Sequence, residues 1–122
     1  MENRKDEARA LPRTMLIVDD DIINRSILEN IFSRYYRIEE AEDGSEGLEK
    51  ILSNPDRLCA ILLDVVMPRM DGIQVLRRLH ETGLTDRVPV FLITAEACDS
   101  VMREGYQLGV MDVIGKPVIP YV

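Results

Sequence analysis

The chain has 122 residues and a formal net charge of −7, from 15 Lys and Arg against 22 Asp and Glu. At roughly 150 residues per domain this length predicts one domain, which can bury about two thirds of its unfolded surface without a disulfide or metal. The acidic balance argues against direct nucleic-acid binding. The apolar runs are also far shorter than the roughly 18 residues of a membrane span.

The first segment, residues 1–13, differs from the rest of the chain. It has mixed charges, no periodicity and a proline at position 12, so we expect a disordered lead-in before a domain at 14–122. The segment is too charged for a signal peptide, and the two cysteines form no metal-binding pattern, which together favour a cytoplasmic protein.

Short apolar runs alternate with segments of helical periodicity along the rest of the chain. In the first half of the chain we expect a buried strand at 15–18, a helix from 23 as far as Tyr35, a weaker strand at 37–41 and a helix at 44–53. In the second half we expect a strand at 59–63, a helix closing near Gly83, a strand at 88–93, a helix at 99–108 capped by Gly109, and a strand at 111–114. This alternation predicts an α/β fold with a parallel sheet and helices on both faces.

Three of the expected helices have clear apolar positions. Ile23, Ile27, Leu28 and Ile31 recur at helical spacing in the first, Leu48, Ile51 and Leu52 are expected on the inner face of the second, and the third carries Ile73, Leu76 and Leu79. Three other residues point to no site: His80 is expected on the surface, and Cys59 and Cys98 are expected too far apart for a disulfide.

Polar residues follow four of the five expected strands. They are Asp19, Asp20 and Asp21 after the first, Asp64 after the third, Thr94 after the fourth and Lys116 after the fifth. The carboxyl ends of parallel strands meet at one edge of the sheet, where open α/β sheets bind ligands. Taken singly, an aspartate there is often only a helix N-cap.

The acidic group as a set requires a further explanation. Two carboxylates about 4 Å apart repel by about 4 kcal/mol at an effective dielectric near 20, so the cluster must take up a proton or a cation. Oxygen ligands suit Mg²⁺. Beside a bound cation, a carboxylate can act as a nucleophile toward phosphorus, with Lys116 and Thr94 available for the phosphoryl oxygens.

These motifs resemble the receiver domain of bacterial two-component response regulators. The resemblance lies in Leu-Ile-Val-Asp-Asp-Asp at 16–21, Leu-Leu-Asp-Val-Val-Met-Pro-Arg-Met-Asp-Gly at 62–72, Leu-Ile-Thr-Ala-Glu-Ala at 92–97 and Gly-Lys-Pro at 115–117. It implies a flavodoxin-like, doubly wound sheet of five parallel strands in the order 2-1-3-4-5.

The resemblance also implies a role for each polar residue. Asp64 would accept a phosphoryl group from a sensor histidine kinase or a phosphotransfer protein. Asp19 and Asp20 would hold Mg²⁺ together with Asp64 and the backbone carbonyl of Val66. Asp21 would then cap the helix that follows.

The remaining roles concern the phosphoryl group itself. Thr94 would be the switch hydroxyl, and Lys116 would bind the phosphate and precede a cis proline.

The chain departs from the family pattern in three places. Val66 stands where many relatives have a polar side chain that influences the lifetime of the phosphoryl group, and Val113 stands where an aromatic switch residue is usual. Only five residues follow Lys116–Pro117, so we expect the final helix to be missing, at a boundary within a longer parent protein. Apolar surface beside the last strand would then be open.

The sequence therefore predicts a phosphorylation-dependent signalling domain, not an enzyme beyond its own phosphorylation and dephosphorylation. Its output would be a domain of the parent chain or a separate effector, and homodimer formation stays open. One alternative is a degenerate receiver that docks partners without phosphorylation. A flavodoxin-like FMN binder is disfavoured because three aspartates would repel a phosphate. A haloacid-dehalogenase-type phosphatase is disfavoured because Val66 stands where it needs a second aspartate.

Overall fold

A five-stranded parallel sheet forms the centre of the protein in the computed structural model, which describes residues 13–118. The strand order is β2-β1-β3-β4-β5. The strands are β1 (Thr14–Val18), β2 (Arg37–Ala41), β3 (Leu58–Asp64), β4 (Val90–Thr94) and β5 (Asp112–Gly115). This architecture and strand order confirm the predicted flavodoxin-like fold. The predicted lead-in, except for Arg13, lies outside the described residues.

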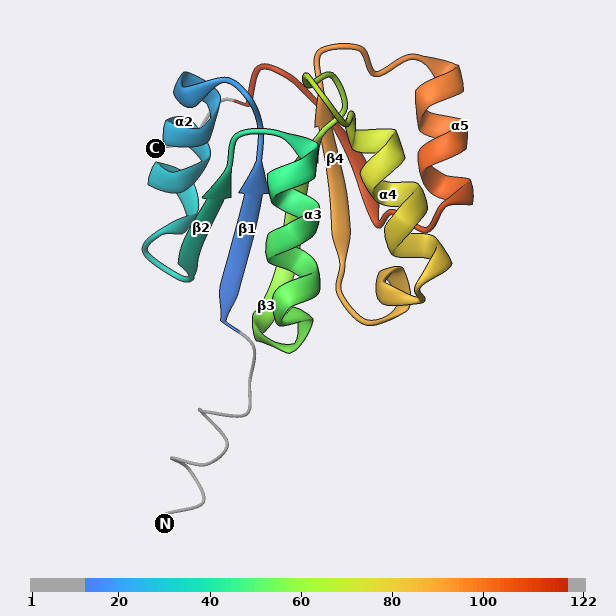
Figure 1. The fold of residues 1–122 in the computed structure, drawn as a ribbon. Coiled ribbons are helices and arrows are strands. Elements are labelled where there is room, and N and C mark those ends of the chain that lie inside the picture. Colours follow the sequence, from blue (N-terminus) through green and yellow to red (C-terminus); the bar gives the residue numbers. More distant parts are fainter. Residues whose placement is uncertain (1–12, 119–122) are drawn as a thin grey trace.

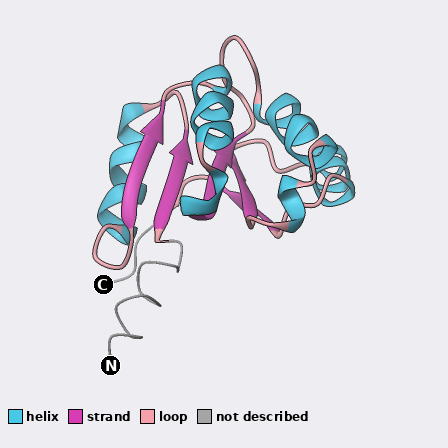
Figure 2. Cartoon of the chain, turned by 60° about the horizontal axis from the view of Figure 1, so that its bottom comes forward, coloured by secondary structure: helices cyan, strands magenta, loops and turns pink. Residues whose placement is uncertain are grey.

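Helices cover both faces of the sheet, as expected for a doubly wound fold (Figures 1 and 2). The helix α2 (Ile22–Phe32) packs on one face, and α3 (Gly44–Ser53), α4 (Gly72–Glu81) and α5 (Asp99–Gln107) pack on the other. Two short 3₁₀ helices, Pro55–Arg57 and Leu84–Asp86, precede β3 and β4. Between β5 and residue 118 no further helix follows, in agreement with the expected absence of the final helix.

The apolar core is divided by the sheet into two clusters. Side chains alternate between the two faces of a strand, so the continuous apolar run of β1 supplies both clusters. Leu16 of β1 belongs to the larger cluster together with Leu76 of α4, whereas Ile17 and Leu28 belong to the smaller cluster beneath α2. Both faces of β1 are therefore buried, as its sequence predicted.

Two apolar residues of the predicted helices lie outside the core. Ile23 is 66% exposed, and Leu52 is 46% exposed, so the prediction of Leu52 on the inner face of its helix was wrong. At about 100° per residue, Ile23 lies roughly 140° from the buried Leu28, whereas Arg25 lies three residues before Leu28 and shares its face. The inner face of α3 is formed by Gly47, Leu48 and Ile51, which leaves Leu52 outside.

Several element boundaries also differ by a few residues from those expected. Helix α2 ends at Phe32 and not at Tyr35, because the amides of Tyr35 and Tyr36 both donate to the Phe32 carbonyl in the turn that leads to β2. Strand β4 begins at Val90, since the amide of Val88 donates to the Leu84 carbonyl instead.

Aspartate N-caps fix three of the helices at the carboxyl edge of the sheet. The Asp21 side chain accepts from the Ile23 amide, and the Asp43 side chain accepts from the Glu46 amide. Asp71 forms a capping box with Gln74. Each cap satisfies amide groups that the first helical turn leaves without a partner. The N-cap expected for Asp21 is confirmed.

We predict that Gly72→Ala destabilises the fold, because a Cβ at residue 72 would lie 2.1 Å from the Asp64 carbonyl oxygen. A forced displacement of backbone of this kind costs about 1–3 kcal/mol or more. Urea unfolding followed by circular dichroism measures the change. Gly115→Ala is the matched control, since a Cβ there meets nothing within 4 Å. Equal stability of the two variants would contradict the prediction.

Candidate functional site

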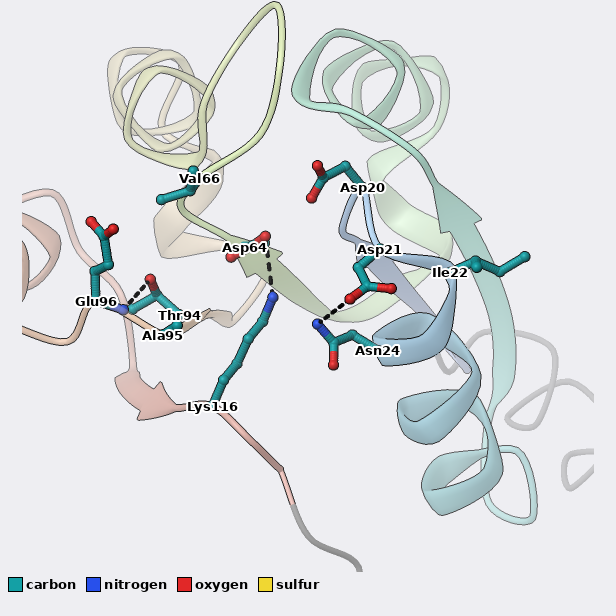
Figure 3. A pocket seen from close by; sticks show the side chains of 10 residues that line it. All are labelled: Asp20, Asp21, Ile22, Asn24, Asp64, Val66, Thr94, Ala95, Glu96 and Lys116. Carbon is teal, nitrogen blue, oxygen red and sulfur yellow. Dashed lines mark hydrogen bonds and ion pairs between the residues drawn. The ribbon is translucent and has the colours of Figure 1, made fainter.

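The carboxyl edge of the sheet carries an open cleft (Figure 3). Its walls come from the segments that follow β1, β3, β4 and β5. The lining residues are Asp20, Asp21, Ile22, Asn24, Asp64, Val66, Thr94, Ala95, Glu96 and Lys116. Asp19 lies behind this surface and is 1% exposed. All the predicted site residues thus lie in or beside one cleft.

Three carboxylates converge in this cleft. One oxygen from each of Asp19, Asp20 and Asp64 lies within 4.8 Å of the other two. Asp64 is 5% exposed at the end of β3, whereas Asp20 faces solvent. The two buried charges, on Asp19 and Asp64, are close together and poorly hydrated, so they repel strongly.

Lys116 is the cation that faces the buried carboxylates. Its Nζ lies 2.9 Å from Asp19 Oδ2 and 3.2 Å from Asp64 Oδ2. Burial opposes the charge of Lys116, but its close pairing with the Asp19 carboxylate and the attraction of Asp64 outweigh this effect and raise its pKa. The ammonium therefore stays charged near neutral pH. The Lys116–Pro117 peptide bond is cis, as the resemblance implied.

One lysine does not neutralise the cluster. Burial, together with repulsion from Asp19, raises the pKa of Asp64 from 3.8 to about 6, although Lys116 acts in the opposite direction. Asp64 therefore needs either a proton or more positive charge than Lys116 supplies.

The donor set fits a hard divalent cation. Asp19 Oδ1 accepts a hydrogen bond from the Asp21 amide. Asp19 Oδ2 is buried and accepts no well-oriented hydrogen bond, although the ammonium of Lys116 lies nearby and balances its charge. Asp19 Oδ2 therefore still has lone pairs that could bind a cation. The cluster offers only carboxylate oxygens, the ligands that Mg²⁺ prefers. Asp19, Asp20 and Asp64 could hold such an ion.

Thr94 is fully buried at the end of β4. Its Oγ1 accepts from the Glu96 amide at 3.0 Å, and its carbonyl oxygen accepts from the Lys116 amide at 2.9 Å. The hydroxyl is thus tied to the loop after β4, while the backbone of the same residue holds Lys116 beside the cleft.

The position of the usual aromatic switch residue holds the partly buried Val113, which packs against the larger core cluster. The nearby Tyr106 does not replace it, because its hydroxyl donates to Asp112 at 2.8 Å. Val66 is exposed and presents an apolar side chain to the cleft. His80 is exposed, and Cys59 and Cys98 are free, as predicted.

Arg25 lies beside the site but was not among the residues predicted from the sequence. This residue is 7% exposed and donates from Nη1 to the Asp19 carbonyl oxygen at 2.7 Å. The one feature of the sequence that indicates its burial is its position three residues before Leu28, on the same face of the helix. Apolar periodicity does not detect this, because it treats arginine as a surface residue.

The comparisons with known proteins agree with this geometry. A family model described as "Response regulator receiver domain" matches residues 15–121. A response regulator, MprA of Mycolicibacterium vanbaalenii, is 39% identical over 88% of this chain and 45% of its own length. A probable cyclic di-GMP phosphodiesterase of Vibrio cholerae is 35% identical over 86% of this chain and 23% of its own. This chain thus spans less than half of either relative.

A solved structure shares the fold. The chain superposes with a TM-score of 0.82 on a CheX-CheY-BeF3-Mg²⁺ complex from Borrelia burgdorferi, at 29% identity, covering 93% of this chain and 84% of that one. Within residues 13–118, no helix is long and apolar enough to cross a membrane.

We predict that Asp64→Asn stabilises the metal-free protein at pH 8 by about 1–3 kcal/mol. The pKa of Asp64 is raised in the fold from 3.8 to about 6, so its contribution to stability is full below 3.8 and is lost as the pH rises through 6. An asparagine cannot ionise and avoids this loss. Urea unfolding in EDTA at pH 4 and pH 8 measures the difference.

The matched control for this experiment is Asp56→Asn, at a carboxylate that is 81% exposed. Its effect on stability should be small at both pH values. A destabilising Asp64→Asn at pH 8, or one whose effect is the same at both pH values, would contradict the prediction.

Proposed function

Because the chain belongs to the response regulator receiver domain family, we propose that Asp64 accepts a phosphoryl group from the phosphohistidine of a kinase or phosphotransfer protein. Receiver domains are signalling modules of two-component systems. The observation that supports this assignment is the position of Asp64, which is nearly buried yet lines the open cleft with Lys116 at 3.2 Å.

The proposed transfer balances as a substitution at phosphorus. A carboxylate oxygen of Asp64 attacks the phosphorus atom and forms a P–O bond, while the P–N bond to the donor imidazole breaks and its electron pair stays on the imidazole, which takes up a proton. The product is an acyl phosphate. Attack of water on its phosphorus releases inorganic phosphate and restores the carboxylate.

The chain's own side chains would bind the phosphoryl oxygens. Lys116 would exchange an Asp19 oxygen for one phosphoryl oxygen, and the Thr94 hydroxyl would turn away from the Glu96 amide and donate its hydrogen to a second. Asp19, Asp20, Asp64 and the Val66 carbonyl would hold Mg²⁺. The ion, when bound, supplies the positive charge that the transfer requires.

The output of the proposed switch lies beyond the described domain. The relatives MprA and the Vibrio phosphodiesterase are both much longer than this chain. We therefore propose that the domain acts in the cytoplasm on an output domain of a longer parent protein or on a separate effector.

A docking module independent of phosphorylation is the second candidate function. Val113 favours it, because the aromatic side chain that usually responds to phosphorylation is missing from β5. The convergence of Asp64, Thr94 and Lys116 on one cleft favours the phosphoacceptor.

We predict that incubation with acetyl phosphate and Mg²⁺ adds the mass of one phosphoryl group, measured on the intact protein. EDTA and Asp64→Asn should each abolish the adduct. Asp21→Asn is the matched control, since Asp21 caps α2 and asparagine caps equally well. An unmodified wild-type protein would favour the docking module, and loss of the adduct in Asp21→Asn would contradict the choice of Asp19 and Asp20 as the metal pair.

We predict that Val66→Asn shortens the lifetime of the phosphorylated protein several-fold. Val66 is exposed in the cleft and has no polar atom in its side chain to orient an attacking water, whereas an amide does. The decay of the adduct after removal of acetyl phosphate measures the rate. Val66→Thr tests a hydroxyl, and Val66→Leu is the apolar control. Decay as slow in Val66→Asn as in Val66→Leu would contradict this prediction.

A further inference from the structure

We propose that Arg25 is a positioning residue for the acidic cluster. Arg25 would fix the peptide group between Asp19 and Asp20, so that both carboxylates face one cation. This inference rests on the magnesium site of the proposed function. Arg25 does not line the cleft, and it is buried between α2 and the ends of two strands.

The contacts of Arg25 join three segments. Nη1 donates to the Asp19 carbonyl oxygen at 2.7 Å in a buried hydrogen bond, and Nε donates to Glu40 Oε1 of β2 at 2.9 Å. The Arg25 amide donates to the Asp21 carbonyl in the first turn of α2. One guanidinium thus connects the helix, the loop after β1 and the neighbouring strand.

The rest of Asp19 is already held. Its amide donates to the Ala41 carbonyl at 3.1 Å, and its Oδ1 accepts from the Asp21 amide at 2.9 Å. The carbonyl oxygen is the remaining backbone atom, and Arg25 is its donor. The plane of the Asp19–Asp20 peptide group is therefore set by Arg25.

Asp20 depends on this peptide plane more than the other two acids do. Among residues 13–118, its carboxylate forms no hydrogen bond or ion pair, whereas Asp19 and Asp64 both pair with Lys116. No side-chain contact among these residues orients Asp20, so the Asp20 backbone determines where its Cβ lies and which rotamers can reach the other acids. A change in the Asp20 backbone on rotation of the preceding peptide would therefore alter how well its carboxylate meets the other two.

Charge and position predict opposite effects on cation binding. The guanidinium is positive, so its removal by charge alone would strengthen the binding of Mg²⁺. Removal of a group that orients the ligands would weaken it, typically by about 10–100-fold for groups that support metal ligands. The sign of the change separates the two roles.

The test is calorimetric titration of the purified protein with Mg²⁺, at a temperature where every variant is folded. Arg25→Gln should weaken binding by about 10-fold. Arg25→Lys retains the charge but not the two-branched donor group, so it should also weaken binding and serves if Arg25→Gln fails to fold. Arg57→Gln is the matched control, because Arg57 forms the equivalent pair with Glu39 of β2 away from the cleft.

Each outcome decides between the hypotheses. Weaker binding in both Arg25 variants, with Arg57→Gln unchanged, supports the positioning role. Unchanged or tighter binding in the Arg25 variants, with a wild type that binds Mg²⁺, overturns this inference and leaves the proposed function intact. A wild type that binds no Mg²⁺ overturns the magnesium site, and the positioning role with it.

Discussion

Repulsion between the carboxylates at the end of β1 and the end of β3 is the constraint on which the site depends. Because β1 and β3 are adjacent parallel strands, Asp19 and Asp64 at their ends lie close together. Their burial removes the water that would screen the two charges. Lys116 opposes part of this repulsion. The remaining negative charge is what makes the cleft a place for a cation and, beside a cation, for a phosphoryl group.

The fold maintains this unfavourable arrangement with backbone interactions around the cleft. Gly72 allows the start of α4 to approach the Asp64 carbonyl, and the Gly72 amide donates to the Val65 carbonyl at 2.8 Å. The loop between Val65 and Gly72 is held from the other side by Arg69, which pairs with the buried Asp43 that caps α3. Asp19 and Asp64 cannot separate without breaking helix caps and sheet contacts, so their negative charge stays in the cleft.

The sequence predicted the sheet and most of the cleft because both depend on local patterns. A buried parallel strand is a short apolar run, and the residue that follows it must lie at the carboxyl edge, so Asp64 and Lys116 could be placed from their positions alone. Arg25 could not be placed in this way. Its burial is made favourable by partners distant in the chain, above all Glu40, and a search for apolar periodicity does not place an arginine on the inner face of a helix.

In the proposed mechanism, Val113 would change how a signal leaves the cleft. In the proposed mechanism the Thr94 hydroxyl turns to the phosphoryl group and gives up the Glu96 amide, its hydrogen-bond partner in the loop before α5. This loop, residues 95–98, is exposed throughout. Because β5 offers no aromatic ring to follow Thr94, the loop would be the element that gains freedom directly from the proposed phosphorylation. The change would therefore reach α5 through its N-terminus and not through the packing of β5.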